Sequence, residues 1–187
     1  MKLIAVVGMA GSGKSELSRF FEKEGFKRIR FGDITDEILE KRGLQINEKN
    51  ERVLREGLRK EHGMEAYAKL NLPKVKNALE KHNVVVDGLY SWEEYKLLRH
   101  EFGKSLVLLA VYSSPNRRYQ RLVDRIKRPL TREQAEQRDE MELSHLNKAP
   151  PIAMADYTIL NNGTLFDLKE EFYEFYEWLR EKNKTDN

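Results

Sequence analysis

Apolar runs of strand length alternate along the chain with charged segments that have helical spacing. Residues 2–8, 83–88 and 105–114 are nearly continuous apolar runs, which is typical of strands covered on both faces. Shorter runs at residues 26–33 and 155–163 predict two more strands. Strands that alternate with helices predict an α/β fold of three layers, with helices on both faces of a mostly parallel five-stranded sheet.

Glycine and proline residues divide the helical segments. Residues 14–25 end at Gly25, a residue type that often terminates a helix. Residues 34–42 and 48–80 are charged with helical periodicity, and we expect Gly43, Gly63 and Pro73 to interrupt them. Further helices are predicted over residues 92–102, 116–128, 131–143 and 165–182, with Thr131 as the N-cap of its helix.

The composition describes one globular domain with a heavily charged surface. The chain has 187 residues, and 34 Lys and Arg against 31 Asp and Glu give a net charge of +3. Because these charges are interspersed, a nucleic-acid interface is not expected. The absence of cysteine excludes disulfides and thiolate metal sites. The first apolar run is too short for an export signal or a membrane span, so a cytoplasmic location is expected, whereas the oligomeric state stays open.

Residues 8–15, GMAGSGKS, match the phosphate-binding pattern G-x-x-x-x-G-K-[ST]. The motif follows a predicted strand and opens a predicted helix, which is the context that such a loop requires. Glycines let successive backbone N–H groups point inward at the positive end of a helix dipole. Lys14 would contact the β- and γ-phosphates of ATP, and Ser15 would ligate Mg²⁺. The residues expected to bind ATP here are Gly8, Met9, Ala10, Gly11, Ser12, Gly13, Lys14 and Ser15.

A phosphate-binding loop alone does not identify an activity, since switches, motors and kinases share it. A GTPase would carry a guanine-reading N-K-x-D motif, which the segment ILNNGT (159–164) does not supply. The chain also leaves little room for the additional domains of motor ATPases. A small-molecule kinase therefore fits a chain of this length.

Three blocks of the sequence resemble the nucleoside-monophosphate-kinase group of P-loop kinases, and dephospho-CoA kinases and their adenylate-kinase-related cousins in particular. Residues 1–36 contain the phosphate-binding loop and FGDITDEI. Residues 83–128 and 131–170 contain the basic helix, the A-x-x-R pattern from Ala135 to Arg138 and the ending MADYTILNNGTLFDL.

The resemblance implies a single P-loop kinase domain over residues 1–187. Within it, residues 116–150 would form a helical lid and residues 34–80 a helical region that binds the acceptor. The D-G-x-I-D-R segment expected of dephospho-CoA kinases is absent from residues 37–80, so the identity of the acceptor is left open.

Phosphoryl transfer needs cations around the moving group. Arg121 and Arg125 are four residues apart on the basic helix and would face the phosphates, with a solvated basic helix as the alternative. Arg138 would do the same from the lid, as its place in the A-x-x-R pattern implies. Asn161 and Asn162 would line the adenine pocket, although a strand-ending turn explains them equally well.

Asp33 ends the second predicted strand, at the edge where ligands bind in open α/β sheets. It would align or deprotonate an alcohol acceptor, or else cap the helix that follows it. Arg55 and Arg59 are helical neighbours in the expected acceptor region and would hold an acceptor phosphate. Surface pairing with nearby glutamates is the alternative for these two arginines.

Asp87 and Gly88 end the third predicted strand. In adenylate-kinase-like enzymes the corresponding strand ends in D-G-F-P-R, where the aspartate lies near Mg²⁺ and the arginine binds the acceptor phosphate. The resemblance therefore gives Asp87 a place beside Mg²⁺. The next residues, Leu89 to Ser91, supply no cation for an acceptor phosphate.

The leading hypothesis is an ATP- and Mg²⁺-dependent phosphotransferase that acts on a small nucleotide-like acceptor, with dephospho-CoA as the first candidate. A nucleoside or deoxynucleoside monophosphate kinase is the close alternative. A regulatory ATP-binding NTPase with a protein or RNA partner is an alternative from a different class.

Overall fold

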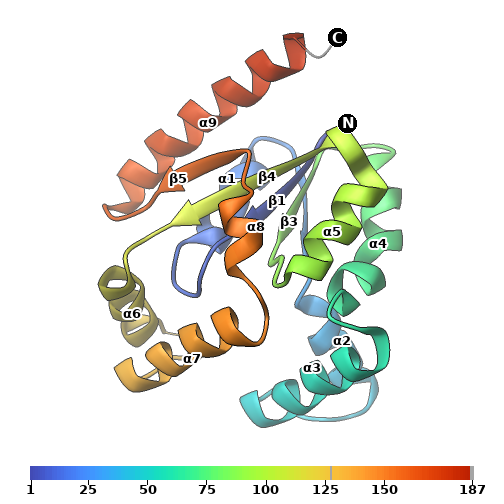
Figure 1. Cartoon of the computed structure of the whole chain (residues 1–187), viewed down its shortest axis with the longest axis vertical. Coiled ribbons are helices and arrows are strands. Elements are labelled where there is room, and N and C mark those ends of the chain that lie inside the picture. Colours follow the sequence, from blue (N-terminus) through green and yellow to red (C-terminus); the bar gives the residue numbers. More distant parts are fainter. Residues whose placement is uncertain (127, 186–187) are drawn as a thin grey trace.

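Five parallel strands form the centre of the molecule, with helices on both faces of the sheet (Figure 1). The computed structural model describes residues 1–126 and 128–185. The strands are β1 (Leu3–Val7), β2 (Lys27–Arg30), β3 (Val84–Asp87), β4 (Leu106–Tyr112) and β5 (Tyr157–Leu160). Their order is β2-β3-β1-β4-β5, and all neighbouring strands are parallel. The predicted α/β class and five-stranded sheet are confirmed.

The helices fall close to the predicted segments. They are α1 (Lys14–Lys23), α2 (Asp33–Lys41), α3 (Glu48–His62), α4 (Ala66–Leu79), α5 (Trp92–Phe102), α6 (Pro115–Asp124), α7 (Arg132–Ser144), α8 (Ala149–Ala153) and α9 (Leu165–Thr185), with a 3₁₀ turn, η1 (Gly103–Ser105), before β4. Gly63 separates α3 from α4 as expected. Thr131 caps α7 in a capping box with Gln134. Among the described helices, none is long and apolar enough to cross a membrane.

The expected interruption at Pro73 is wrong, because Pro73 lies inside α4 and the helix continues past it. Proline removes one helical hydrogen bond, which tertiary packing can offset. In α4 the neighbouring side chains supply that packing, since Tyr67 and Val75 are 1% and 0% exposed.

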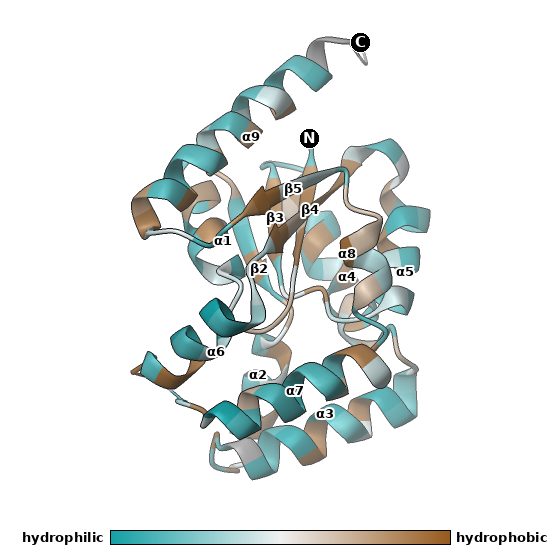
Figure 2. Ribbon diagram, turned by 60° about the vertical axis from the view of Figure 1, so that its left-hand side comes forward, coloured by the Kyte–Doolittle hydropathy of each residue, from teal (hydrophilic) through white to brown (hydrophobic). Residues whose placement is uncertain are grey.

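The two faces of the sheet carry separate apolar cores. Alternate residues of β1 point to opposite faces, so Leu3 and Val7 join the core under α4 and α5, while Ile4 and Val6 join the core under α1 and α9. All five residues of β1 are fully buried, as expected for a central parallel strand. Helix α7, far from the sheet, is mostly hydrophilic (Figure 2).

Helices α6 and α7 lie beyond the carboxyl end of β4, on the same side of the molecule as α2 and α3 (Figure 1). The carboxyl ends of parallel strands form the edge where ligands bind in open α/β sheets. The segments predicted as lid and acceptor region therefore lie around this edge.

Phe172 is expected to be essential for the core between α1 and α9. It is 0% exposed, and its ring lies 4.9 Å from Phe21 and 5.5 Å from Phe20 between centroids. Phe172→Ala should lower the free energy of unfolding by about 3–5 kcal/mol, because it leaves a cavity. Urea denaturation followed by circular dichroism measures this change. Phe166→Ala is the matched control in the same helix, since Phe166 is 68% exposed, and it should change the value by less than about 0.5 kcal/mol. Equal losses in the two variants would contradict the assigned packing.

Candidate nucleotide-binding site

The loop between β1 and α1 wraps tightly at the carboxyl edge of the sheet. Gly8, Gly11 and Gly13 have φ angles of 149°, 76° and 105°, a region that side chains other than glycine rarely adopt. A Cβ atom on Gly11 would lie 2.7 Å from the backbone oxygen of Arg118, and one on Gly13 would collide with the amide of Asn161. The glycines are thus needed for backbone conformation and for close packing.

Three distant segments of the chain hold this loop. The Nδ2 of Asn161 donates to the carbonyl of Ser12 at 2.7 Å. The backbone of Ala10 is held from both sides: its carbonyl accepts from Arg118 Nη1 at 3.1 Å, and its N–H donates to Glu142 Oε2 at 3.1 Å. Contacts from the residue that follows β5, from α6 and from α7 therefore fix the shape of the loop.

Lys14 folds back over the loop. Its Nζ donates to the carbonyls of Gly8 and Met9, both at 2.9 Å. Burial, followed by the positive charge of Lys148, lowers the pKa of Lys14 to about 7, against an opposing effect of Glu142. Strongly shifted pKa values are concentrated at functional sites. The shift occurs at the lysine of the phosphate-binding motif, which makes this loop the candidate functional site.

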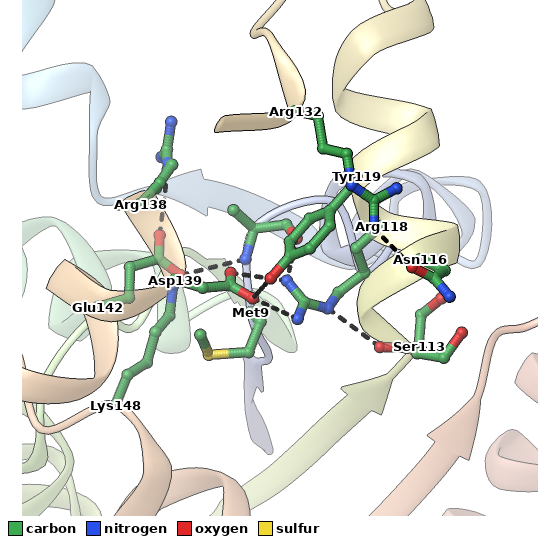
Figure 3. A network of polar contacts seen from close by, with 12 residues as sticks. Met9, Ser113, Asn116, Arg118, Tyr119, Arg132, Arg138, Asp139, Glu142 and Lys148 are labelled. Carbon is green, nitrogen blue, oxygen red and sulfur yellow. Dashed lines mark hydrogen bonds and ion pairs between the residues drawn. The ribbon is translucent and has the colours of Figure 1, made fainter. Parts of the chain in front are cut away.

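Helices α6 and α7 are joined to each other by buried charges (Figure 3). Arg118 of α6 makes a bidentate pair with Asp139 of α7, at 2.7 Å and 2.5 Å. The hydroxyl of Tyr119 also donates to Asp139, at 3.0 Å. Ala10, Leu122 and Ala135 add a small apolar cluster beneath these contacts. The predicted lid is therefore docked on the loop by charged and apolar contacts together.

One turn further along α7, Glu142 lies among cations. Its Oε2 accepts from Lys148 Nζ at 2.8 Å, and its Oε1 accepts from Arg138 Nε at 3.3 Å. Burial would raise the pKa of Glu142, but Lys148, Lys14 and Arg138 lower it to about 2. The carboxylate is thus fully ionised at neutral pH. Figure 3 shows Glu142 between Arg138 on one side and Lys148 on the other.

The predicted adenine-side residues lie together beside the loop. Arg121 donates to the carbonyl and to the Oδ1 of Asn161, at 3.0 Å and 3.2 Å. Asn162 Oδ1 accepts from the backbone N–H of Ser114 at 2.8 Å.

Arg125 follows the last residue of α6 and donates to the carbonyl of Arg128. The expectation that Arg125 shares a helix face with Arg121 is wrong, because α6 ends at Asp124 and Arg125 is extended.

Ser15 and Asp87, the predicted Mg²⁺ residues, differ in their surroundings. Ser15 is exposed in the first turn of α1. Asp87 is 6% exposed and accepts from Arg28 Nη2 at 2.5 Å. The described residues contain no group of three acidic or histidine side chains that could hold a metal alone. Mg²⁺ usually takes few ligands from the protein itself and several from bound phosphates. The hydroxyl of Ser15 together with the phosphates of a nucleotide would therefore suit this ion.

Asp33, the first predicted acceptor residue, lies just beyond the end of β2. Helix α2 begins at Asp33 with Gly32 at the N-cap, so the alternative of Asp33 as N-cap is wrong. Asp33 pairs with Arg30 at 2.8 Å and lines a groove of about 470 Å³ between β2 and α4. Burial raises the pKa of Asp33, against a lowering by Arg30.

The two predicted acceptor arginines of α3 have different partners. Arg55 pairs with Glu51 at 3.2 Å. The guanidinium of Arg59 lies 5.4 Å from the ring centroid of Tyr67, within range of a cation–π contact.

Sequence reasoning missed Arg118, Asp139, Glu142 and Lys148. Ala135, Asp139 and Glu142 recur at helical spacing, which is a signal for one shared face of α7, but α7 is too rich in charge for that face to stand out. Lys148 lies outside any motif, at the N-cap of α8. Glu142 and Arg118 contact Ala10, which lies more than a hundred residues away in the sequence, so only the folded chain reveals their place at the loop.

The fold and the site define a P-loop nucleotide-binding protein with the architecture of small kinases. A family model, AAA_18, described as an AAA domain, matches residues 4–143. The UPF0200 protein of Thermococcus kodakarensis is 39% identical over 173 residues, which cover 90% of this chain and 93% of that protein. The UPF0200 protein of Methanosarcina mazei is 35% identical over 173 residues, or 91% of each chain. The chain belongs to the UPF0200 family.

Solved structures support the fold. The chain is similar to a shikimate kinase from Bacteroides thetaiotaomicron (TM-score 0.64, 15% identity, 96% of this chain and 98% of that one). It is also similar to a gluconokinase from Sinorhizobium meliloti (TM-score 0.64, 17% identity, 100% and 97%). A dephospho-CoA kinase from Campylobacter jejuni has a TM-score of 0.58 at 17% identity, covering 98% and 100%. These likenesses establish the shared fold.

The lowered pKa of Lys14 predicts that nucleotide binding depends on pH. The protonated side chain attracts phosphate, so the affinity for ATP should fall as the pH rises through about 7. We expect a loss of roughly 10-fold between about pH 6 and pH 8.5, the scale of one charged hydrogen bond. Isothermal titration calorimetry at constant ionic strength measures it. In the control, Lys14→Arg, the guanidinium stays charged, so the loss of affinity above about pH 7 should be clearly smaller than in the wild type. A flat wild-type profile would refute the assigned environment of Lys14.

Proposed function

We propose that the protein is an ATP- and Mg²⁺-dependent phosphotransferase that acts on a small nucleotide-like acceptor. The observation that carries this proposal is the docking of α7 on the phosphate-binding loop, where Glu142 and Lys148 are 4% and 0% exposed. Transfer to an acceptor requires that water be excluded from the phosphoryl group. A regulatory NTPase that hydrolyses ATP has no need of such an enclosure, so the enclosure favours a kinase.

Each part of the site has a role in this reaction. The backbone N–H groups of the loop and Lys14 would hold the phosphates, and Arg121, Asn161 and Asn162 would lie beside the adenine. Arg138 would add positive charge where the phosphoryl group moves. Ser15 would hold Mg²⁺, which neutralises charge on the phosphates when bound. Asp87 would lie beside this metal site. Its carboxylate would then leave Arg28 and bind the water molecules around the ion.

The acceptor would bind on the side of α2 and α3. Asp33 has a raised pKa and lies half exposed at the end of β2, as suits a base that takes the proton of an alcohol. Arg55 and Arg59 would hold an acceptor phosphate. Dephospho-CoA is the first candidate acceptor, a choice supported by the sequence resemblance and by the likeness to a dephospho-CoA kinase structure. Nucleoside monophosphates are the second class, since Arg55 and Arg59 suit them.

Purified protein with Mg-ATP should release ADP faster when its acceptor is supplied. Dephospho-CoA, AMP, CMP and deoxynucleoside monophosphates are tested in turn, with ADP followed by a coupled assay. Lys14→Ala should lose the stimulated rate by at least about 100-fold. Lys104→Ala is the control, because Lys104 is exposed in η1, away from the loop. If every acceptor left the ATP-only rate unchanged, the kinase proposal would fail in favour of a regulatory NTPase.

Asp33→Asn separates an alcohol acceptor from a phosphate acceptor. The variant removes the base but keeps the size, so transfer to an alcohol should fall by about 10²-fold or more while ATP affinity stays near wild type. Transfer to a nucleoside monophosphate, which is already anionic, should change far less. The rate and the dissociation constant for ATP are measured with the same preparation. Wild-type transfer to dephospho-CoA in this variant would exclude Asp33 as the base.

A further inference from the structure

Lys148 is a lysine whose side chain is wholly buried beside the phosphate-binding loop. It is 0% exposed, and its Nζ lies 5.2 Å from the ring centroid of Tyr90, in the loop that follows β3. We propose that Lys148 is a second phosphate-binding lysine, which acts with Lys14 on the terminal phosphoryl group. This inference rests on the proposed function, and Lys148 lies outside the residues matched by the family model.

The position of one carboxylate oxygen supports the assignment. Glu142 Oε2 accepts at the same time from Ala10 N, at 3.1 Å, and from Lys148 Nζ, at 2.8 Å. A negatively charged oxygen therefore already binds between an N–H group of the loop and the ammonium of Lys148. A phosphoryl oxygen needs the same two kinds of donor. Glu142 thus marks a place where an anionic oxygen is stabilised at the mouth of the loop.

The charges around this point favour an added anion. Lys14, Lys148 and Arg138 interact with one another and with Glu142, the carboxylate that they share. Of the other nearby acids, Asp87 is paired with Arg28, and Glu94 accepts from the backbone N–H of Tyr90. Burial raises the pKa of Glu94 to about 7, so its negative charge is partial at neutral pH. Lys14, whose pKa is about 7, is charged at about pH 6, where Glu94 is mostly protonated and the three cations outnumber Glu142. An added anion balances this excess of positive charge.

In the proposed step, the acceptor oxygen forms a bond to the γ-phosphorus while the bond from that phosphorus to the β–γ bridging oxygen breaks. The bridging oxygen leaves with ADP, and the proton of the acceptor hydroxyl passes to Asp33. Lys148 transfers no proton, and donates hydrogen bonds to the phosphoryl oxygens throughout. If Lys148 served only as the counter-ion of Glu142, it would hold α7 in place but would not distinguish ATP from ADP.

The test is the ratio of the affinities for ATP and ADP, measured by calorimetry at about pH 6, where Lys14 is protonated. Lys148→Met should lower this ratio by about 10-fold, because a charged hydrogen bond to the terminal phosphate is lost. Lys148→Arg should keep most of the wild-type ratio. Lys104→Met is the matched control on the surface. A ratio within twofold of wild type in folded Lys148→Met would overturn the proposal.

Removing Lys148 alone leaves Glu142 short of a buried partner and could prevent folding. The same comparison is therefore made in the Glu142→Gln background, where Lys148→Met leaves no unpaired carboxylate. The ratio should again fall by about 10-fold relative to Glu142→Gln alone, and an unchanged ratio would overturn the proposal here as well. Both measurements need no acceptor. A protein that transfers phosphate to no acceptor would therefore refute the proposed function without deciding the role of Lys148.

With an active acceptor, kinetics add a second readout. Lys148→Met should lower kcat by about 10²-fold, with a smaller change in the KM for the acceptor, because the lost contact is to the moving phosphoryl group. Lys148→Arg should recover part of kcat. A loss confined to the acceptor KM would contradict the assignment.

Discussion

The peptide groups of Ala10 are the point on which the site depends. The carbonyl of Ala10 accepts from Arg118 of α6, and its N–H donates to Glu142 of α7. Arg118 is in turn paired with Asp139 of α7. The phosphate-binding loop and both lid helices therefore form one hydrogen-bonded unit. Neither the loop nor α7 can move without breaking contacts made by the other.

Charges buried in this unit contribute specificity more than stability. Taking an ion pair out of water costs about as much as the pair regains, whereas removing one partner is strongly unfavourable. The pairs Arg118–Asp139 and Lys148–Glu142 thus do not explain why the chain folds, which the two apolar cores do. These ion pairs explain why α7 docks in one register, since any other register would leave a buried charge without its partner.

The sequence predicted what local pattern determines. Continuous apolar runs predicted three of the five strands and shorter segments predicted the other two, while the glycine spacing predicted the phosphate-binding loop. Both kinds of pattern depend on residues close together in the chain. The predicted interruption at Pro73 was wrong, because the packing around Tyr67 and Val75 stabilises α4 by more than the proline destabilises it. Glu142 and Lys148 were not predictable, since their significance arises from an N–H group more than a hundred residues away. Asp87 was found at the right edge, but its pairing with Arg28 of the neighbouring strand has no local signal.

The nucleotide side and the acceptor side differ in how firmly their charges are held. Around the loop, four charged residues are almost fully buried, namely Arg118, Asp139, Glu142 and Lys148. On the acceptor side, Asp33 and Arg30 are 45% and 49% exposed, and such pairs are weak enough to be exchanged for a ligand. Arg128, in the connection between α6 and α7, pairs with Glu51 of α3 at 2.7 Å and is 55% exposed. This contact joins the lid to the acceptor region. If the proposed function holds, a ligand bound near α3 would influence α6 and α7 through Glu51, which is 6% exposed and also pairs with Arg55.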